Sequence, residues 1–262
     1  MEIITSRNNY LIKDVVRLRD FPSFRRKTGL FFIEGIRLCL DAASSGLKAK
    51  YLFVTEKFYL SKKKECENLF LISEKLFLIS DDVSEKISDT KNPQGIFLVV
   101  YGLDNQNNIN KINFNGKYIA FENLQNPDNL GAAARTAEAL GLDGLIVSGG
   151  CDVCNPKALR ASMGSLFRLN VILSPDLSET LIFLRDNGMS TYAAVVRDAD
   201  TFVNTMDVSG GIVCAVGNEG NGLSEKVISS CMKKMTIPMK GRAESLNASQ
   251  AATIIMWEMM SR

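Results

Sequence analysis

The chain has 262 residues, of which 46% are apolar, so we expect one large or two ordinary domains whose core needs no disulfides. A formal net charge of +2 excludes a polycation, and no apolar run approaches the roughly 20 residues that span a bilayer. The N-terminus lacks the basic-then-apolar pattern of a secretory signal, which predicts a cytoplasmic protein without a membrane partner.

Residues 1–101 are predicted to alternate amphipathic helices with short apolar strands. Leu11, Val15 and Leu18 recur on one face, which predicts a helix over residues 10–19. A second helix is predicted over residues 35–45, ended by Gly46. Aromatic and β-branched residues predict strands at residues 30–33, 51–54, 76–79 and 96–101.

The first 40 residues carry an excess of positive charge, with eight basic side chains against four acidic ones. Such an excess suits a surface that faces phosphate groups. On charge alone, a solvated helix face explains it equally well.

Residues 102–116 are rich in asparagine and are the best candidate for a linker. From residue 117 onward, strands alternate with helices, which predicts an α/β domain with a mainly parallel sheet. A helix is predicted over residues 130–140, closed by Gly141. Continuous apolar runs predict buried strands at residues 118–121, 144–147, 191–196 and 212–216. Ligands of such sheets bind beyond the carboxyl ends of the strands.

The last predicted helix, residues 248–260, is apolar on nearly every side. A helix of this kind is buried. Either a partner subunit or the ordinary core of the domain can cover it.

The content of histidine and cysteine limits the possible chemistry. The chain has no histidine, which removes the usual general base and the Ser-His and Cys-His nucleophile systems. Its six cysteines are expected to be free thiols in the cytoplasm. Cys151 and Cys154 have the spacing of half a zinc site, but a tetrahedral site needs two further ligands and no second close pair exists. We therefore expect buried or semi-buried thiols and no metal.

Three polar or glycine-rich loops, residues 122–135, 216–223 and 237–248, are predicted to surround a ligand. In the first loop, Asn129 stands where a helix N-cap is expected, so capping is its alternative role. Arg135 follows on a helix face of small apolar residues and must reach a partner or solvent.

The second loop has glycines at 217, 220 and 222, in the reverse order of the dinucleotide fingerprint G-x-G-x-x-G. They allow a flat ligand close to the backbone, although a tight strand-to-helix turn would need them too. Glu219 can accept hydrogen bonds from a substrate or orient a neighbouring arginine. In the third loop, Ser245 or Asn247 either lines the site or caps the last helix.

In combination, order and spacing, the three loops resemble the signature motifs of the SpoU, or TrmH, branch of the SPOUT methyltransferases. Residues 157–164 are similar to a basic Ser- and Gly-containing loop of that family. The N-terminal half resembles its accessory substrate-binding domain, which is similar to an RNA-binding ribosomal protein. The residues that carry this second resemblance are Asn8, Arg17, Arg26, Phe32–Gly35 and Pro93–Gly95.

The resemblance implies transfer of a methyl group from S-adenosylmethionine to a ribose 2′-hydroxyl of RNA. It also implies a homodimer and a C-terminal α/β domain tied in a deep trefoil knot, an exception to the rule against threaded chains. The implied domains are an α/β RNA-binding domain over residues 1–101, the linker 102–116 and the methyltransferase domain 117–262.

By the same resemblance, three sets of residues form the site, and none binds a metal. The catalytic set is Arg135, Asn129, Glu219, Ser245 and Asn247. The cofactor-binding set is Gly217, Asn218, Ile237, Met239 and Leu246. The RNA-binding set is Arg17, Arg26, Arg160 and Ser162.

Mechanisms for this family often name the motif-one arginine as the base. Because a guanidinium normally stays protonated, we expect Arg135 instead to hydrogen-bond the 2′-oxygen and stabilise its developing negative charge. The proton then passes late, to a transiently neutral Arg135 or to a phosphate oxygen of the RNA.

The accessory domain favours ribosomal RNA, especially that of the large subunit, over transfer RNA. An antibiotic-resistance methyltransferase would share every motif. A non-catalytic RNA-binding or ribosome-assembly factor is the alternative of a different class, but it would not need the catalytic set. The reversed glycine spacing argues against a nucleotide-dependent oxidoreductase.

Overall fold

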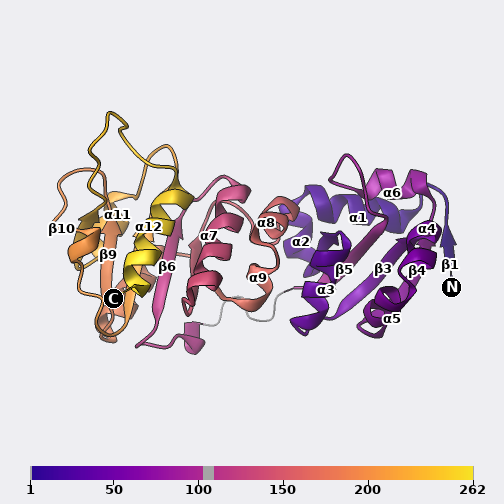
Figure 1. Ribbon diagram of the computed structural model, residues 1–262, viewed down its shortest axis with the longest axis horizontal. Helices are drawn as coiled ribbons and strands as arrows, with labels where there is room; N and C mark the ends of the chain where they lie inside the picture. The colour runs from indigo at the N-terminus through magenta and orange to yellow at the C-terminus, as the bar shows by residue number, and fades with distance from the viewer. Residues whose placement is uncertain (1, 103–108, 262) are drawn as a thin grey trace. The chain divides into compact units, whose positions relative to one another are not determined.

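The computed structural model describes residues 2–102 and 109–261. Among these, residues 2–102 group with 154–167 in one compact unit, and 109–153 group with 168–261 in a second (Figure 1). Residues 103–108 of the predicted linker lie outside the described residues. The predicted domain boundaries stay a prediction.

The first unit contains a mixed five-stranded sheet in the order β1-β4-β3-β5-β2. Strand β4 pairs in parallel with β1 and β3, whereas β5 runs antiparallel to β3 and β2. The strands are β1 (Glu2–Ile4), β2 (Leu30–Glu34), β3 (Ala49–Thr55), β4 (Ser73–Ile79) and β5 (Ile96–Tyr101). The four strands predicted in this half are therefore confirmed, within three residues at each end.

Helices of the first unit pack on this sheet around a core in which Ile12, Val15 and Leu18 join phenylalanines of the strands. The helices are α1 (Tyr10–Asp20), α2 (Pro22–Thr28), α3 (Ile36–Ser44), α4 (Glu56–Ser61), α5 (Lys63–Leu71), α6 (Asp81–Ile87) and α8 (Pro156–Ser162). Both predicted helices are confirmed as α1 and α3. Helix α8 contacts β2, and the rings of Phe31 and Phe167 lie 6.3 Å apart.

The second unit is built on a seven-stranded sheet in the order β10-β12-β9-β11-β6-β7-β8, and every neighbouring pair is parallel. The strands are β6 (Lys117–Glu122), β7 (Gly144–Ser148), β8 (Asn170–Leu173), β9 (Ser190–Ala194), β10 (Thr201–Phe202), β11 (Ile212–Val216) and β12 (Lys233–Thr236). This confirms the predicted α/β class with a mainly parallel sheet. The strand predicted over residues 191–196 ends earlier, at Ala194.

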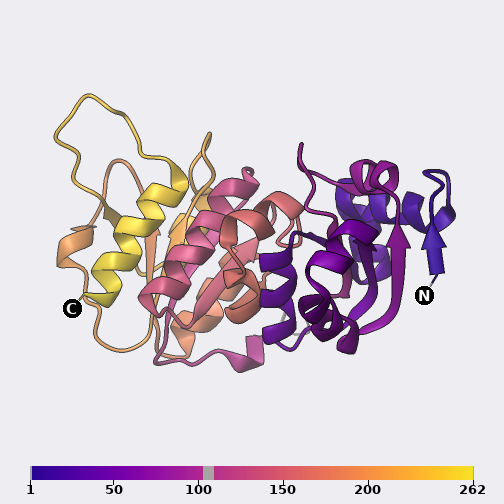
Figure 2. The same ribbon diagram turned by 45° about the vertical axis from the view of Figure 1, so that its right-hand side comes forward.

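Helices cover both faces of the parallel sheet. Side chains of α10 and α11 pack on the face that carries Tyr118 and Ala120 of β6. Helices α7 and α12 pack against each other, and they lie side by side in both views (Figure 1, Figure 2). The helical segments of this unit are α7 (Pro127–Leu140), α10 (Leu177–Asp186), α11 (Glu225–Ser230), α12 (Ala248–Met260) and the 3-10 turns η1 (Ile109–Lys111) and η2 (Val203–Thr205). The short helix α9 (Ser165–Arg168) begins in the first unit and ends at Arg168, the first residue of the later segment of the second unit.

Helix α12 has the predicted bounds but is buried on one side only. Ala252, Ile255 and Met256 are buried, whereas Trp257 is 58% exposed. The core of this chain therefore covers one side of the helix only, and cover of the other side by a partner subunit stays a prediction.

The six cysteines are free, and each is buried or half-buried, which confirms the prediction for the thiols. Within the described ranges, no group of three or more acidic or cysteine side chains could hold a metal ion. No helix among those residues is long and apolar enough to cross a membrane.

Candidate functional site

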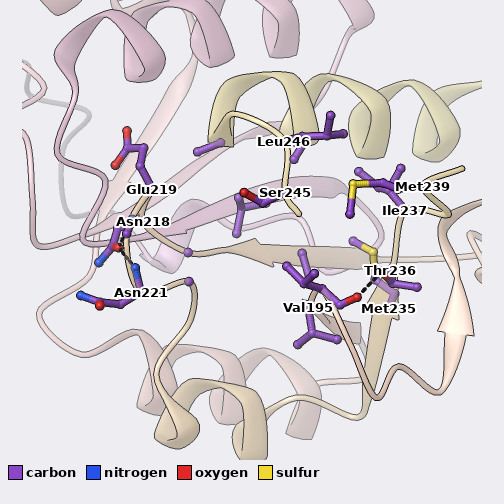
Figure 3. Close-up of a pocket in the computed structure, with 18 residues that line it drawn as sticks. Val195, Asn218, Glu219, Asn221, Met235, Thr236, Ile237, Met239, Ser245 and Leu246 are labelled. Atoms are coloured by element: carbon purple, nitrogen blue, oxygen red, sulfur yellow. Dashed lines mark hydrogen bonds between the residues drawn. The ribbon is translucent and has the colours of Figure 1, made fainter. Parts of the chain in front are cut away.

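A cavity of about 320 Å³ opens at the carboxyl ends of β9, β11 and β12. Its walls are the loop after β11, the ends of β9 and β12, and the segment that leads into α12 (Figure 3). The five residues predicted to bind the cofactor all line it: Gly217, Asn218, Ile237, Met239 and Leu246. Two residues of the predicted catalytic set, Glu219 and Ser245, line it as well.

The loop formed by residues 217–223, here called the glycine loop, folds back on itself directly after β11. Asn218 and Gly222 exchange backbone hydrogen bonds of 3.2 and 3.1 Å. The Asn218 side-chain oxygen accepts from the backbone N–H groups of Gly220 at 2.9 Å and Asn221 at 2.7 Å. A Cβ on Gly217 would lie 1.9 Å from the carbonyl carbon of Gly222, so only glycine fits there. The loop is thus a fixed wall of the cavity.

Hydrogen bonds connect the three motifs at one end of the cavity. Asn129 Nδ2 donates to Glu219 Oε1 at 2.6 Å, and Asn247 Nδ2 donates to Asn129 Oδ1 at 3.1 Å. Gln125 N donates to Glu219 Oε2 at 3.3 Å. Because a carboxylate only accepts, the amide nitrogen of Asn129 must face Glu219 and its oxygen must face Asn247. The direction of the hydrogen bonds in the network therefore follows from the negative charge on Glu219.

The protonation of Glu219 follows from the same contacts. Partial burial raises the pKa of the Glu219 carboxyl, but hydrogen bonds from Asn129 and from backbone N–H groups lower it by more, so the pKa lies below its ordinary value. Glu219 is therefore ionised at neutral pH. It is suited to hold a donor or attract a positive charge, and unsuited to accept a proton.

Asn129 does not take its alternative role as an N-cap, because Asn126 caps helix α7 instead. The Asn126 side chain accepts from Asp128 N at 2.9 Å, and Pro127 opens the helix. Asn129 then falls inside the first turn, with 7% of its surface exposed. Asn247 does cap α12, accepting from Ser249 N at 2.9 Å, while its amide nitrogen reaches Asn129.

Two residues of the predicted catalytic set stand apart from this network. Arg135 lies on α7 with an exposed side chain, does not line the cavity, and has no hydrogen bond or ion pair to any described residue. Ser245 lines the cavity with an exposed side chain. One chain thus brings together the cofactor-binding residues and the Asn129–Glu219–Asn247 network, but not Arg135.

The predicted RNA-binding residues differ in their exposure. Arg26 is exposed, and Arg17 lies 4.0 Å above the Phe24 ring while it pairs with Asp14 at 3.3 Å. Arg160 pairs with Asp89 at 2.5 Å.

Ser162 is fully buried, and its hydroxyl donates to the Leu159 carbonyl at 2.8 Å. Its role in RNA binding stays a prediction, and its burial counts against a direct contact.

Sequence reasoning missed the part of the cavity that β9 and β12 provide. Val195, Val196 and Thr236 line it, and Thr236 ends β12. The strand β12 has the sequence Lys-Lys-Met-Thr, whose charges hide it from a search for apolar runs. The rule that ligands bind beyond the carboxyl ends of parallel strands would have found these residues once β12 was recognised.

Comparisons with known proteins agree with this geometry. Residues 116–257 match the SpoU rRNA Methylase family, and residues 9–98 match the MRM3-like substrate binding domain. The chain is 28% identical to 23S rRNA (guanosine(2553)-2′-O)-methyltransferase RlmP of Bacillus subtilis over 99% of both chains. It is 30% identical to the 23S rRNA (uridine(2479)-2′-O)-methyltransferase of Streptomyces viridochromogenes, over 89% of this chain and 83% of that one.

Solved structures show the same fold along the whole chain. The SpoU methyltransferase AviRb from Streptomyces viridochromogenes, in complex with AdoMet, superposes with a TM-score of 0.87 at 27% identity, covering 97% of this chain and 98% of that one. The AdoMet-bound rRNA methyltransferase from Sinorhizobium meliloti gives 0.86 at 27% identity, with 98% and 97% covered. Since the family match spans more than half of the residues, this chain belongs to the SpoU rRNA methylase family.

Proposed function

We propose that the protein transfers a methyl group from S-adenosylmethionine to a ribose 2′-hydroxyl of ribosomal RNA in the large subunit. The observation that carries the proposal is the cavity in which the predicted cofactor-binding residues converge beside the Asn129–Glu219–Asn247 network. Two relatives that match along most of the chain are named as 23S rRNA 2′-O-methyltransferases, and two structural neighbours contain AdoMet.

The residues of the cavity fit this cofactor. Its volume of about 320 Å³ lies within the usual range of small-molecule pockets, about 300–1,000 Å³. Ile237, Met239 and Leu246 offer an apolar surface for a flat base. Glu219 is the one charged side chain among the described lining residues, and its negative charge favours a cation. When bound, S-adenosylmethionine supplies a methyl group on a positive sulfonium, which leaves readily as a neutral thioether.

The polar residues at the end of the cavity would orient the reaction. Glu219 holds Asn129, and Asn129 holds Asn247, so the network fixes the three motif loops against each other. Ser245, exposed at the cavity, is available to the ribose or the cofactor. Arg135 would donate to the 2′-oxygen and stabilise its developing charge, since a guanidinium has donors and no acceptor.

Arg135 does not line the cavity of its own chain, so its proposed role points to the cavity of a second subunit. We infer a homodimer that covers the outer faces of α7 and α12, because Trp257 on α12 is 58% exposed and Arg135 on α7 has no partner among the described residues. An exposed tryptophan is an unusual residue for open solvent and a frequent anchor at interfaces. In such a dimer, Arg135 of one subunit would complete the cavity of the other.

The remaining predictions belong to the same proposal. The first unit would bind RNA through exposed arginines such as Arg17 and Arg26, and the match over residues 9–98 supports a substrate-binding role. The trefoil knot stays a prediction. A cytoplasmic location is inferred because the proposed substrate, like that of the bacterial relatives, belongs to the ribosome.

The decisive experiment maps ribose 2′-O-methylation across total RNA from cells with and without the protein. We expect one position in large-subunit ribosomal RNA to gain the modification, and cells that produce Asn129→Ala serve as the inactive control. No gain at any position would overturn the proposal. Calorimetric titration with S-adenosylmethionine and with NAD distinguishes it from an oxidoreductase, and binding of RNA without S-adenosylmethionine would favour a non-catalytic factor.

A further inference from the structure

Glu122 is the last residue of β6, and both of its carboxylate oxygens accept hydrogen bonds from Ser224, which lies 102 positions further along the chain. Oε2 accepts from Ser224 N at 2.7 Å, and Oε1 accepts from Ser224 Oγ at 2.7 Å. The parallel register pairs Phe121 with Val216, so Glu122 stands level with the point where β11 enters the glycine loop. A half-buried carboxylate at a strand end thus reaches across to the far end of that loop.

Ser224 is the point at which the glycine loop becomes helix α11. Its Oγ accepts from Val227 N at 3.3 Å, which caps the helix. The start of the loop is held by strand β11, and its middle is held by the bonds from Asn129 and Gln125 to Glu219. Glu122 supplies the third point, at the end. It adds to the Asn218–Gly222 backbone bonds within the loop and to the buried side chain of Leu223.

The glycine loop forms a wall of the cavity, whereas Glu122 and Ser224 do not line it. We propose that Glu122 is a positioning residue that holds the glycine loop in the shape required to bind S-adenosylmethionine. This inference rests on the proposed function for its ligand. Its physical basis is preorganisation: a loop already fixed in its bound shape loses less conformational entropy when the ligand arrives.

Variants of Glu122 and Ser224 test the role. Glu122→Ala removes both acceptors from Ser224 and is expected to raise the Kd and KM for S-adenosylmethionine about 10-fold, with kcat at saturation within about twofold. In Glu122→Gln, the amide oxygen can still accept from Ser224 N. The amide nitrogen can donate to Ser224 Oγ once the hydroxyl has rotated, so we expect a Kd within about threefold of the wild type. In the Ser224→Ala background, Glu122→Ala should have a smaller effect, because the two residues act as one unit.

Glu225 provides the matched control. It is an exposed carboxylate in the first turn of the same helix α11 and does not line the cavity. Glu225→Ala should therefore leave the Kd within about twofold. A Glu122→Ala protein that melts earlier but binds S-adenosylmethionine with the wild-type Kd would overturn the proposal, as would an equal loss in Glu225→Ala.

Hydrogen exchange without ligand separates this inference from the proposed function. Amides of residues 217–224 should exchange faster in Glu122→Ala than in the wild type, because the end of the loop is released. Unchanged exchange would overturn the role of Glu122 whatever the ligand is. Exchange could be faster in Glu122→Ala while the wild-type protein binds no S-adenosylmethionine. That result would support the role of Glu122 in fixing the loop, but it would overturn the proposed function and the choice of ligand.

Discussion

The cofactor cavity and the outer face of α7 differ in how completely one chain builds them. In the cavity, the glycine loop is closed by its own backbone bonds, and Glu219 is tied to Asn129. On α7, Arg135 is exposed and has no partner among the residues that the structure describes. The same motif thus contributes Asn129, which is fixed against Glu219 of the glycine loop, and Arg135, which is exposed.

The difference shows which part of the site is fixed before ligands bind. A site that binds a flexible small molecule benefits from walls fixed in advance. In the proposed dimer, the donor to the ribose hydroxyl acts only after RNA and a second subunit are in place. The comparison predicts that changes at Arg135 affect the chemical step, whereas changes in the glycine loop affect cofactor binding.

The largest effect is expected from Arg135→Ala. Loss of a donor to a developing negative oxygen lowers kcat by about 100- to 1,000-fold. Because Arg135 does not line the cavity of its own chain, the Kd for S-adenosylmethionine should stay within about twofold of the wild type. Single-turnover methylation of RNA and calorimetry measure the two quantities separately.

Arg135→Lys sharpens the same test. Lysine keeps the charge but presents a compact ammonium in place of the planar fork of donors. Near-normal turnover of Arg135→Lys would make a specific role of the guanidinium untenable.

The next largest effect is expected from Trp257→Glu. A charge in place of an exposed interface tryptophan should raise the dimer dissociation constant at least about 30-fold, which corresponds to about 2 kcal/mol. Sedimentation analysis measures the change. Phe183→Glu, at an aromatic side chain that is 41% exposed on α10, is the control and should remain dimeric.

Mixed dimers test whether Arg135 acts across the interface. Arg135→Ala and Asn129→Ala should each be inactive alone. A mixed dimer has one Arg135→Ala subunit and one Asn129→Ala subunit. If Arg135 completes the partner's cavity, the cavity of the Arg135→Ala subunit receives an intact Arg135 from its partner, so mixing the two variants restores activity. Failure to recover any activity would place Arg135 in the site of its own chain.

A smaller effect, on binding, is expected from Gly217→Ala. Its Cβ would lie 1.9 Å from the carbonyl carbon of Gly222, so the loop must open to make room. We expect the Kd for S-adenosylmethionine to rise about 10-fold or more and the melting temperature to fall by several degrees, since about 1 kcal/mol shifts it by about 2–4 °C in a chain of this size. Gly241→Ala, where nothing lies within 4 Å, should change neither quantity.

The helices and strands that were predicted correctly are those whose pattern of apolar residues lies within one short stretch of sequence. Strand β11 and residues 118–121 of β6 are continuous apolar runs, and α12 begins and ends where its pattern does. Strand β12 was missed because two of its four residues are lysines. The alternative role of Asn129 as the cap of α7 is not observed, because Asn126 takes that position.

The loops around the site were predicted from their residues, whereas the roles of the individual side chains were predicted by resemblance. The bonds from Asn129 to Glu219 and from Asn247 to Asn129 join residues 90 and 118 positions apart. No periodicity encodes such a pairing, because it depends on which strands become neighbours in the sheet. The register of β6 and β11, which brings the first two motifs to one edge, is the missing information.

The smallest expected effect concerns the pH dependence of stability. The pKa of Glu219 is lower in the folded protein than its ordinary value of about 4.5, because the hydrogen bonds from Asn129 and the backbone outweigh partial burial. A lowered pKa means that the folded state favours the ionised carboxylate, so its contribution to stability is fully present above about pH 4.5 and is lost as the pH falls through the lower folded value.

The free-energy difference of unfolding between wild type and Glu219→Gln should therefore be constant from pH 7 to about pH 5 and should shrink below it, as urea titrations at each pH would measure. Glu225→Gln, which removes an exposed carboxylate outside the Asn129–Glu219–Asn247 network, should show no such change. A difference that grows as the pH falls would mean that the carboxylate is held protonated, and that Glu219 is available as a base after all.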